Sequence, residues 1–173
     1  MIEEALNSED IEWKQIELQR GDLLIREGQV EKYVYFVKSG ALRAYIITDS
    51  GDFTLRFGYS GSIITSLPSF FNGKPSELSI EAIRKCNLLQ AKKSDFERFI
   101  QSSEKRLLAY QKVIQDLISD LLEREIDLMY QSPQERFNRV HSRSPQLFQE
   151  VPHKYIASYL RMSPETLSRI LKS

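Results

Sequence analysis

The stretch RGDLLIREGQVEKYVYFVKSGALRAY, residues 20–45, decides the fold of this chain. Short runs of β-prone residues alternate in it with Gly21, Gly28 and Gly40. Glycine readily adopts the positive φ angles of tight turns, so this punctuation is typical of short antiparallel strands. The stretch therefore predicts the opening strands of a β-meander.

The same punctuation continues to Gly73, and all seven glycines of the chain lie before residue 74. The clearest hairpin is ALRAYIITDSGDFTLRF, residues 41–57, with DSGD as the turn between two alternating runs. ELSIEAIRKCNLLQAK, residues 77–92, predicts one or two further strands. About eight short strands in succession indicate a small jelly-roll barrel.

Residues 104–130 predict one long helix, because they contain neither glycine nor proline and their apolar residues recur at helical spacing. Such a helix extends about 40 Å, too far to bury its apolar stripe on a small barrel alone. We therefore expect a parallel seam with a second copy of the chain, and an intramolecular core helix is the alternative. Ile118 and Leu122 would widen the stripe, and Arg124 interrupts it. The residues expected in the dimer seam are Leu107, Tyr110, Ile114, Leu117, Leu121 and Leu128.

The last stretch, HKYIASYLRMSPETLSRILK at residues 153–172, predicts two short helices that cross at a steep angle. Ala157 supplies the small residue where their backbones would touch. Ser163 is a good N-cap for the second helix, and Pro164 suits its first position. Arg161 stands in the turn, where glycine is usual. The spacing indicates a helix-turn-helix, and an unrelated helical hairpin is the alternative.

The chain has no net charge, but its charge is unevenly distributed. Residues 133–173 carry 7 Lys and Arg against 3 Asp and Glu, whereas residues 1–132 carry 17 against 21. A basic segment attached to an acidic body suits binding to nucleic acid. Arginine donates to guanine edges, glutamate accepts from cytosine, and hydroxyl groups hold phosphates. The residues expected to contact DNA are Glu165, Thr166, Ser168, Arg169, Lys172, His153 and Lys154.

With its strands, long helix and helix-turn-helix in this order, the chain from about residue 16 onward resembles the Crp/Fnr family of bacterial transcription regulators. Residues 20–45 are similar to the opening strands of the family's barrel, and YIASYLRMSPETLSRILK, residues 155–172, is similar to its DNA-reading unit. The resemblance implies an α+β chain with an N-terminal β jelly-roll barrel of cyclic-nucleotide-binding type. Members commonly continue into a wing, whereas this sequence ends at Ser173, so we expect a helix-turn-helix without a full wing. The expected regions are an effector domain at residues 1–103, a dimerisation helix at 104–131 and a DNA-binding domain at 132–173.

The resemblance also implies an effector pocket in GSIITSLPSFFNGKPSELSIEA, residues 61–82. In the family, a glutamate holds the ribose of a cyclic nucleotide and an arginine pairs with its phosphate. Aligned on this stretch, the two positions fall on Ser66 and Ser76, and Glu77 follows. Without the arginine, the charge-assisted pair is lost. We therefore expect a degenerate pocket that does not bind cyclic AMP in the usual way.

The chain has too few cysteines and histidines for several metal-dependent functions. One cysteine, Cys86, and two histidines, His141 and His153, are too few for an iron-sulfur cluster or a histidine-rich metal centre, and neither histidine lies in the expected barrel. We therefore expect no enzyme activity, no metal and no cofactor. No apolar run is long enough to span a membrane and no signal-peptide pattern is present, so a cytoplasmic protein is expected.

Together, these features predict a homodimeric, sequence-specific DNA-binding transcription regulator that recognises a near-palindromic site. An unknown small-molecule effector and RNA polymerase are further candidate partners. The alternative is a dimeric ligand-sensing or interaction module that has lost useful DNA binding.

Overall fold

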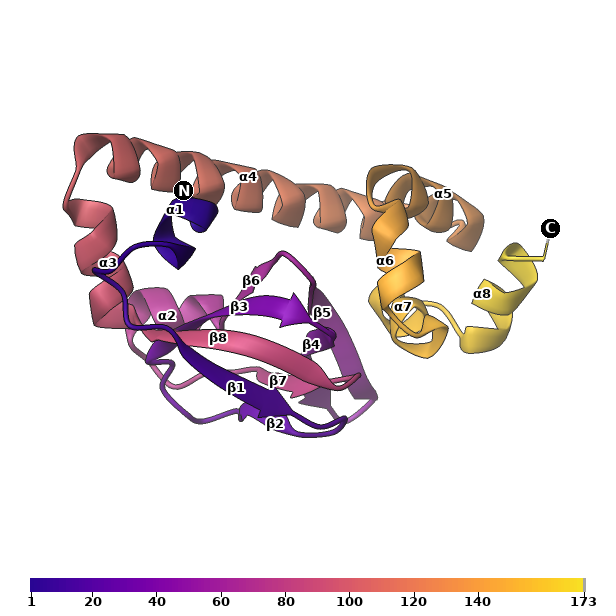
Figure 1. Cartoon of the computed structure of the whole chain (residues 1–173). Helices are drawn as coiled ribbons and strands as arrows, with labels where there is room; N and C mark the ends of the chain where they lie inside the picture. Colours follow the sequence, from indigo (N-terminus) through magenta and orange to yellow (C-terminus); the bar gives the residue numbers. More distant parts are fainter. Residues whose placement is uncertain (173) are drawn as a thin grey trace.

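The computed structural model describes residues 1–172 and contains eight strands and eight helices within them. The strands form two four-stranded antiparallel sheets (Figure 1). The first sheet has the order β1 (Lys14–Leu18), β8 (Cys86–Lys92), β3 (Tyr33–Ser39) and β6 (Ile63–Ile64). The second has the order β2 (Leu23–Ile25), β7 (Ser79–Ala82), β4 (Ala41–Thr48) and β5 (Gly51–Tyr59). The expected α+β chain with an N-terminal β-sandwich is confirmed.

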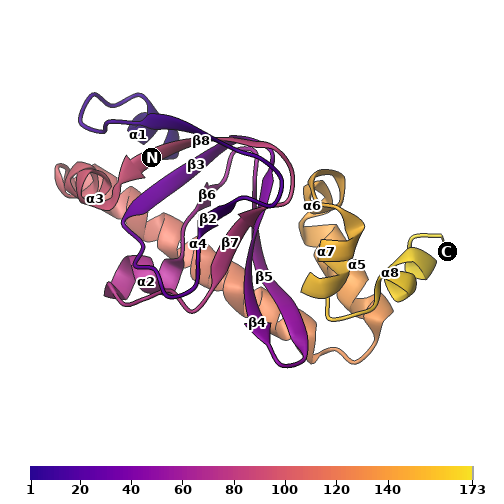
Figure 2. The same ribbon diagram turned by 90° about the horizontal axis from the view of Figure 1, so that it is seen from below.

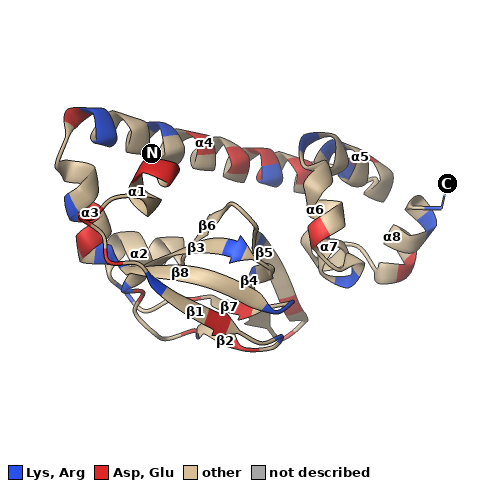
Figure 3. Cartoon of the chain, viewed as in Figure 1, with Lys and Arg blue, Asp and Glu red and all other residues tan. Residues whose placement is uncertain are grey.

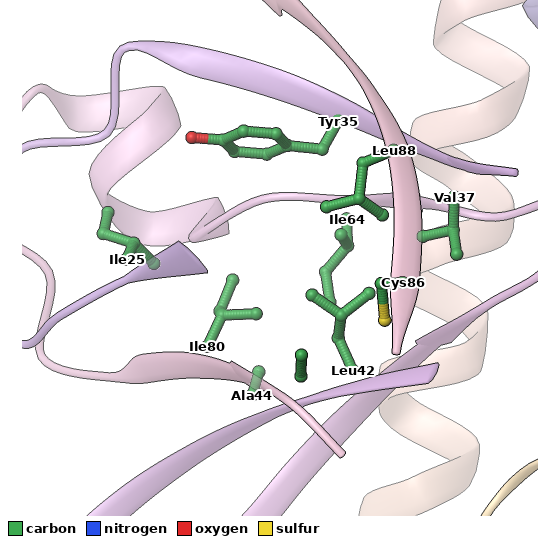
Figure 4. Packing of buried hydrophobic residues seen from close by; sticks show 10 residues of the cluster. Ile25, Tyr35, Val37, Leu42, Ala44, Ile64, Ile80, Cys86 and Leu88 are labelled. Atoms are coloured by element: carbon green, nitrogen blue, oxygen red, sulfur yellow. The ribbon is translucent and has the colours of Figure 1, made fainter. Parts of the chain in front are cut away.

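The main core lies between the two sheets (Figure 4). Alternate residues of each strand point inward, as the two-residue period of a strand requires. Between β3 and β4, Gly40 has φ +95°, and a Cβ at this position would collide with the backbone carbonyl of Lys85. Glycine is therefore required at this turn. The core side chains are Ile25, Tyr35, Val37, Leu42, Ala44, Ile64, Ile80, Ala82, Cys86 and Leu88.

The predicted hairpin is formed by β4 and β5, in which Thr48 pairs with Gly51. A register shift after Ala44 marks a bulge in this pair. Bulges increase the local twist and bend of a strand. The far end of this hairpin extends toward the C-terminal helices (Figure 2).

Four helices surround the sandwich. The helix α2 (Leu67–Asn72) connects β6 to β7, and α1 (Ile2–Leu6), α3 (Lys93–Gln101) and the long α4 (Glu104–Met129) cover one side. A second core joins α1, α3 and sheet residues such as Val34, and Tyr110 of α4 packs against it. The N-terminal part of α4 is thus anchored to its own sandwich, and the helix ends one residue before the predicted position.

The C-terminal helices are α5 (Pro133–Arg143), α6 (Pro145–Glu150), α7 (His153–Tyr159) and α8 (Pro164–Ile170). They share a third core with the sandwich, to which Ala41, Phe57 and Ile83 contribute. The helices therefore pack directly on the strands and do not merely follow the end of α4. Within the described residues, no helix has the length and apolarity that crossing a lipid bilayer requires.

Candidate nucleic-acid interface and effector pocket

The helices α7 and α8 pack against each other through buried side chains. Ala157 has no exposed surface, and Leu167 of α8 is equally buried. Arg161, in the turn, has φ +53° and is the one non-glycine residue with positive φ within residues 1–172. The turn therefore uses the left-handed conformation that glycine usually provides, and here an arginine adopts it.

Arg136 of α5 supports this turn, a role that the sequence analysis missed. Its Nε donates to the carbonyl of Leu160 at 2.8 Å, and its Nη2 donates to the carbonyl of Arg161 at 3.1 Å. Arg136 is itself buried. The arginine satisfies carbonyl groups that the end of α7 would otherwise leave unpaired. Arg136 is one of several basic residues in this segment, and nothing in the neighbouring sequence indicates that its side chain is buried.

The start of α8 is capped as predicted. Ser163 Oγ accepts a hydrogen bond from the backbone N–H of Thr166 at 3.2 Å, and Pro164 occupies the first turn. A hydrogen bond from its own backbone N–H lowers the pKa of Glu165 below the usual value. A carboxylate is favourable at this position because the N-terminus of a helix is its positive end.

The expected DNA-contacting residues lie in two places. On α8, Glu165, Ser168 and Arg169 are exposed, and Thr166 is half-buried with its hydroxyl 3.1 Å from that of Ser163. Lys172, beyond the helix end, is also exposed. The exposed His153 and Lys154 begin α7. The α8 ribbon carries both acidic and basic positions, coloured red and blue in Figure 3.

The β4–β5 hairpin packs against α7 and the following turn. The backbone N–H of Thr54 donates to Ser158 Oγ at 3.1 Å. The guanidinium of Arg161 lies 4.4 Å from the centroid of the Phe53 ring. Cation–π contacts of this kind stabilise neighbouring surfaces. The sandwich therefore directly contacts the helix pair that carries the expected DNA-binding residues.

An ionic cluster joins α4 to α5. Asp127 is 2% exposed, and its Oδ1 lies 2.8 Å from Arg139 Nε and 3.3 Å from Arg143 Nη1. Arg139 also reaches the Glu123 carboxylate at 3.0 Å. Hydrogen bonding to Asp127 raises the pKa of both arginines. The buried carboxylate thus links the C-terminal end of α4 to α5.

The predicted effector pocket contains its own closed hydrogen-bond network. Ser66 and Ser76 are both buried, and their Oγ atoms lie 2.7 Å apart. Ser76 Oγ donates to the carbonyl of Leu78, so the bond between the serines uses the Ser66 hydrogen. Glu77 is exposed. Two small neutral groups therefore fill the positions at which the family resemblance implied a glutamate and an arginine.

Glu31 completes this network and was not identified from the sequence. Its side chain is 3% exposed, and its carboxylate accepts backbone N–H bonds from Lys32 at 3.1 Å, Tyr33 at 3.1 Å and Ser66 at 3.2 Å. Burial raises the pKa of Glu31, and the N–H donors oppose that rise. Because this carboxylate already accepts the Ser66 N–H at the N-cap of α2, that donor is not available to an anionic ligand. The sequence feature that could have identified Glu31 is its position as a single glutamate just before the apolar strand β3.

The expected seam residues of α4 fall into different environments. Leu107 and Leu121 are 42% and 43% exposed, whereas Ile114, Leu117 and Leu128 are half-buried. Tyr110 packs within the chain, with its ring centroid 6.3 Å from that of Phe96. That contact matches the intramolecular alternative for this part of the helix.

Arg124 interrupts the apolar stripe of α4 for a structural reason. Its side chain is buried against the sandwich, and its Nη2 donates to the carbonyl of Thr54 at 3.0 Å. The sequence analysis noted the break in the stripe but not this contact. The partner lies 70 residues away in the sequence.

The two four-stranded sheets, with a short helix between β6 and β7 and a long helix after the sandwich, define the class of domain to which this chain belongs. The chain belongs to the cyclic nucleotide-binding domain family, whose model matches residues 15–103. No sequence among the curated proteins matches the chain.

Solved structures share the fold over nearly the whole chain. FixK2 from Bradyrhizobium japonicum is 18% identical with a TM-score of 0.77, covering 92% of this chain and 83% of its own. A CooA mutant from Carboxydothermus hydrogenoformans is 20% identical with a TM-score of 0.71, covering 98% and 81%. A transcriptional regulator assigned to the Crp/Fnr family, from Eubacterium rectale, is 19% identical with a TM-score of 0.68, covering 92% and 77%. At these identities, the likeness concerns the fold.

Proposed function

We propose that this protein is a homodimeric, sequence-specific DNA-binding transcription regulator without enzyme activity. The observation that carries the proposal is the α7–α8 pair, in which Ala157 is fully buried and a left-handed turn at Arg161 leads into a capped helix. The exposed side of that helix carries Arg169, and Lys172 follows it. Such a pair places its second helix in the major groove of DNA.

In this proposal, base edges and phosphates are contacted by different residues. Arg169 donates to guanine and Glu165 accepts from cytosine, because both side chains are exposed on α8. Lys172 and Ser168 contact phosphates, as do His153 and Lys154 from the start of α7. Thr166, in the first turn of α8 beside Ser163, contacts the DNA backbone from the helix start. The positive excess of residues 133–173 supports this division.

The exposed surface of α4 supports dimerisation. Seven of the twelve exposed large hydrophobic side chains within residues 1–172 lie on α4. Water-exposed apolar side chains concentrated on one helix are typical of an interaction surface. A parallel pair of α4 helices would cover them and hold two α8 helices about one DNA turn, ~34–36 Å, apart. A near-palindromic operator follows from that symmetry. The seven side chains are Leu107, Leu108, Ile118, Leu121, Leu122, Ile126 and Met129.

The sandwich has the sensory role in this proposal, and the three functional regions are residues 1–103, 104–131 and 132–173. Its β4–β5 hairpin contacts α7 through Thr54 and Ser158, so a change in the sandwich can reach the DNA-binding helices without passing through the solvent. Regulation would take place in the cytoplasm, with RNA polymerase as a further partner. The solved Crp/Fnr-family structure with the same fold supports a regulatory role.

Fluorescence anisotropy with DNA fragments selected from the source genome tests this proposal. We expect specific binding at low salt that weakens as salt rises, because counterions are released from the phosphates. A scrambled fragment of equal length and composition is the control. Equal binding to the selected and scrambled fragments would reject sequence-specific regulation and leave the dimeric ligand-sensing or interaction module.

A further inference from the structure

A cavity of about 430 Å³ lies where β5, α4 and the C-terminal helices meet. Three arginines from three different elements line it: Arg56 of β5, Arg124 of α4 and Arg143 of α5. Asp120 is the one carboxylate in that lining. The lining therefore has an excess of positive side chains.

The Arg56 side chain has no hydrogen bond or ion pair to another described residue. Its side chain is half-buried, and burial lowers its pKa while Asp120 and two tyrosines oppose the change from a distance. Removing an unpaired guanidinium from water is unfavourable unless a partner replaces the lost hydration. Arg56 therefore has unused capacity to pair with an anion.

Arg124 provides a second, independent sign of a missing partner. Its side chain is 8% exposed, and its Nε is buried without a hydrogen-bond partner in the described part of the chain. The Nη2 atom bonds to Thr54, and Nη1 lies 3.8 Å from the exposed Glu125 carboxylate. The guanidinium carbon lies 4.7 Å from the centroid of the Tyr159 ring, so only Nε lacks a contact. A buried donor left unpaired in this way calls for an acceptor that the protein itself does not supply.

We propose that this cavity binds a small organic phosphate. A phosphate monoester carries a charge of about −1.5 to −2 at neutral pH and three acceptor oxygens. The planar guanidinium groups of Arg56 and Arg124 suit those oxygens. Tyr59 and Tyr159 also line the cavity and offer apolar ring surfaces to the organic part.

Arg143 has a supporting role in this site. Its guanidinium is held by Asp127, so its charge is already paired and its position is fixed. It adds a positive field at the α5 side of the cavity without providing the primary contact. Neither Ser66 nor Ser76 lines the cavity, so it is a different site from the closed effector pocket.

Occupancy of the cavity would hold the sandwich, the long helix and the C-terminal helices together. The three arginines belong to these three parts, and a shared anion attracts all of them at once. That consequence for DNA binding rests on the proposed function, whereas the binding site itself does not.

Isothermal titration calorimetry of the full chain with phenyl phosphate tests the site. We expect saturable binding that Arg56→Gln weakens at least tenfold. We also expect ligand-free Arg56→Gln to unfold at no lower temperature than the original protein, because the substitution removes an unpaired, half-buried charge. Arg124→Lys keeps the charge but removes the Nε donor, so it should also weaken binding. Arg98→Gln is the matched control, since Arg98 is 72% exposed on α3 and does not line the cavity.

Two further ligands identify the recognised group. Succinate carries two carboxylates, and phenol keeps the ring without the phosphate. We expect both to bind more weakly than phenyl phosphate. Succinate binding as tightly would overturn the assignment to phosphates, and phenol binding as tightly would show an apolar pocket only. Equal effects of Arg56→Gln and Arg98→Gln, or no saturable binding of phenyl phosphate, would reject the site.

The DNA experiment separates this site from the proposed function. Phenyl phosphate binding that depends on Arg56, in a protein that fails to bind DNA, would retain the site and reject the regulator. Specific DNA binding without phenyl phosphate binding would reject the site and retain the regulator.

Discussion

The hydroxyl groups of Ser66 and Ser76 lie 2.7 Å apart in the protein interior, although ten residues separate them in the sequence. With the buried carboxylate of Glu31 beside Ser66, they close the pocket in which the family resemblance places a cyclic nucleotide. The hydrogen-bonding groups of this pocket thus satisfy one another.

Cyclic AMP should therefore show no saturable binding to this pocket. A phosphate would have to displace the Glu31 carboxylate from its N–H donors and would meet a like charge there. Calorimetry with cyclic AMP on the Arg56→Gln variant measures this pocket, because that variant lacks an arginine of the separate 430 Å³ cavity. Micromolar binding retained in this variant would contradict the expectation.

Glu31 should make stability depend on pH in the direction opposite to that of a glutamate whose pKa is lowered on folding, such as Glu165. Burial raises its pKa in the folded state above the usual 4.5, so the folded state binds the proton more tightly than the unfolded state does. Its contribution is fully present below the unfolded pKa and is lost as the pH rises through the folded pKa. Relative to Glu31→Gln, the original protein should gain stability as the pH falls from 7 toward 4.5. Urea denaturation across this range measures the difference, and a constant difference would refute the assignment.

Asp127→Ala should destabilise the protein by about 1–3 kcal/mol, because two arginines lose a charged hydrogen-bond partner. Glu123→Ala removes a carboxylate from the same ionic cluster, but that side chain is 46% exposed and should contribute no more than about 1 kcal/mol. Urea denaturation of both variants gives the comparison. Equal losses of stability would show that burial of Asp127 is not decisive.

Ile118→Glu should convert the proposed dimer to monomers. The side chain is 51% exposed on α4, and a carboxylate at this position would be buried beside its copy in a parallel helix pair. Ile47→Glu is the matched control, because Ile47 is 66% exposed on β4. Sedimentation velocity measures the mass of each variant. A dimer that survives Ile118→Glu would place the interface elsewhere.

Arg169→Ala should weaken specific DNA binding by about 1–3 kcal/mol and relax the preference at one base pair. Lys172→Ala should instead weaken all sequences similarly and reduce the salt dependence, because a phosphate contact carries no base information. Anisotropy titrations against the selected site and its single-base variants distinguish the two effects. Loss of preference in both variants, or in neither, would contradict the assigned roles.

The strand order of the sandwich was not readable from the sequence, although its strands were. Glycine spacing and alternating runs report on neighbouring residues, so they located β3, β4 and β5 and the turn at Gly51. The pairing of β1 with β8 joins residues at opposite ends of the domain, and no local pattern records it. The same limit hid the third core, which packs Phe57 against the C-terminal helices.

The sequence by itself determined the elements whose causes are local: the β-strands between glycines, the long uninterrupted α4, and the capped α8 with Ala157 and Arg161 before it. Only the tertiary structure decided what Glu31, Arg56 and Arg124 do. Glu31 meets Ser66 across 35 residues, and Arg124 meets Thr54 across 70. Secondary structure depends on interactions within a few residues, whereas burial of a charge and the supply of its partner depend on chain segments that only folding brings together.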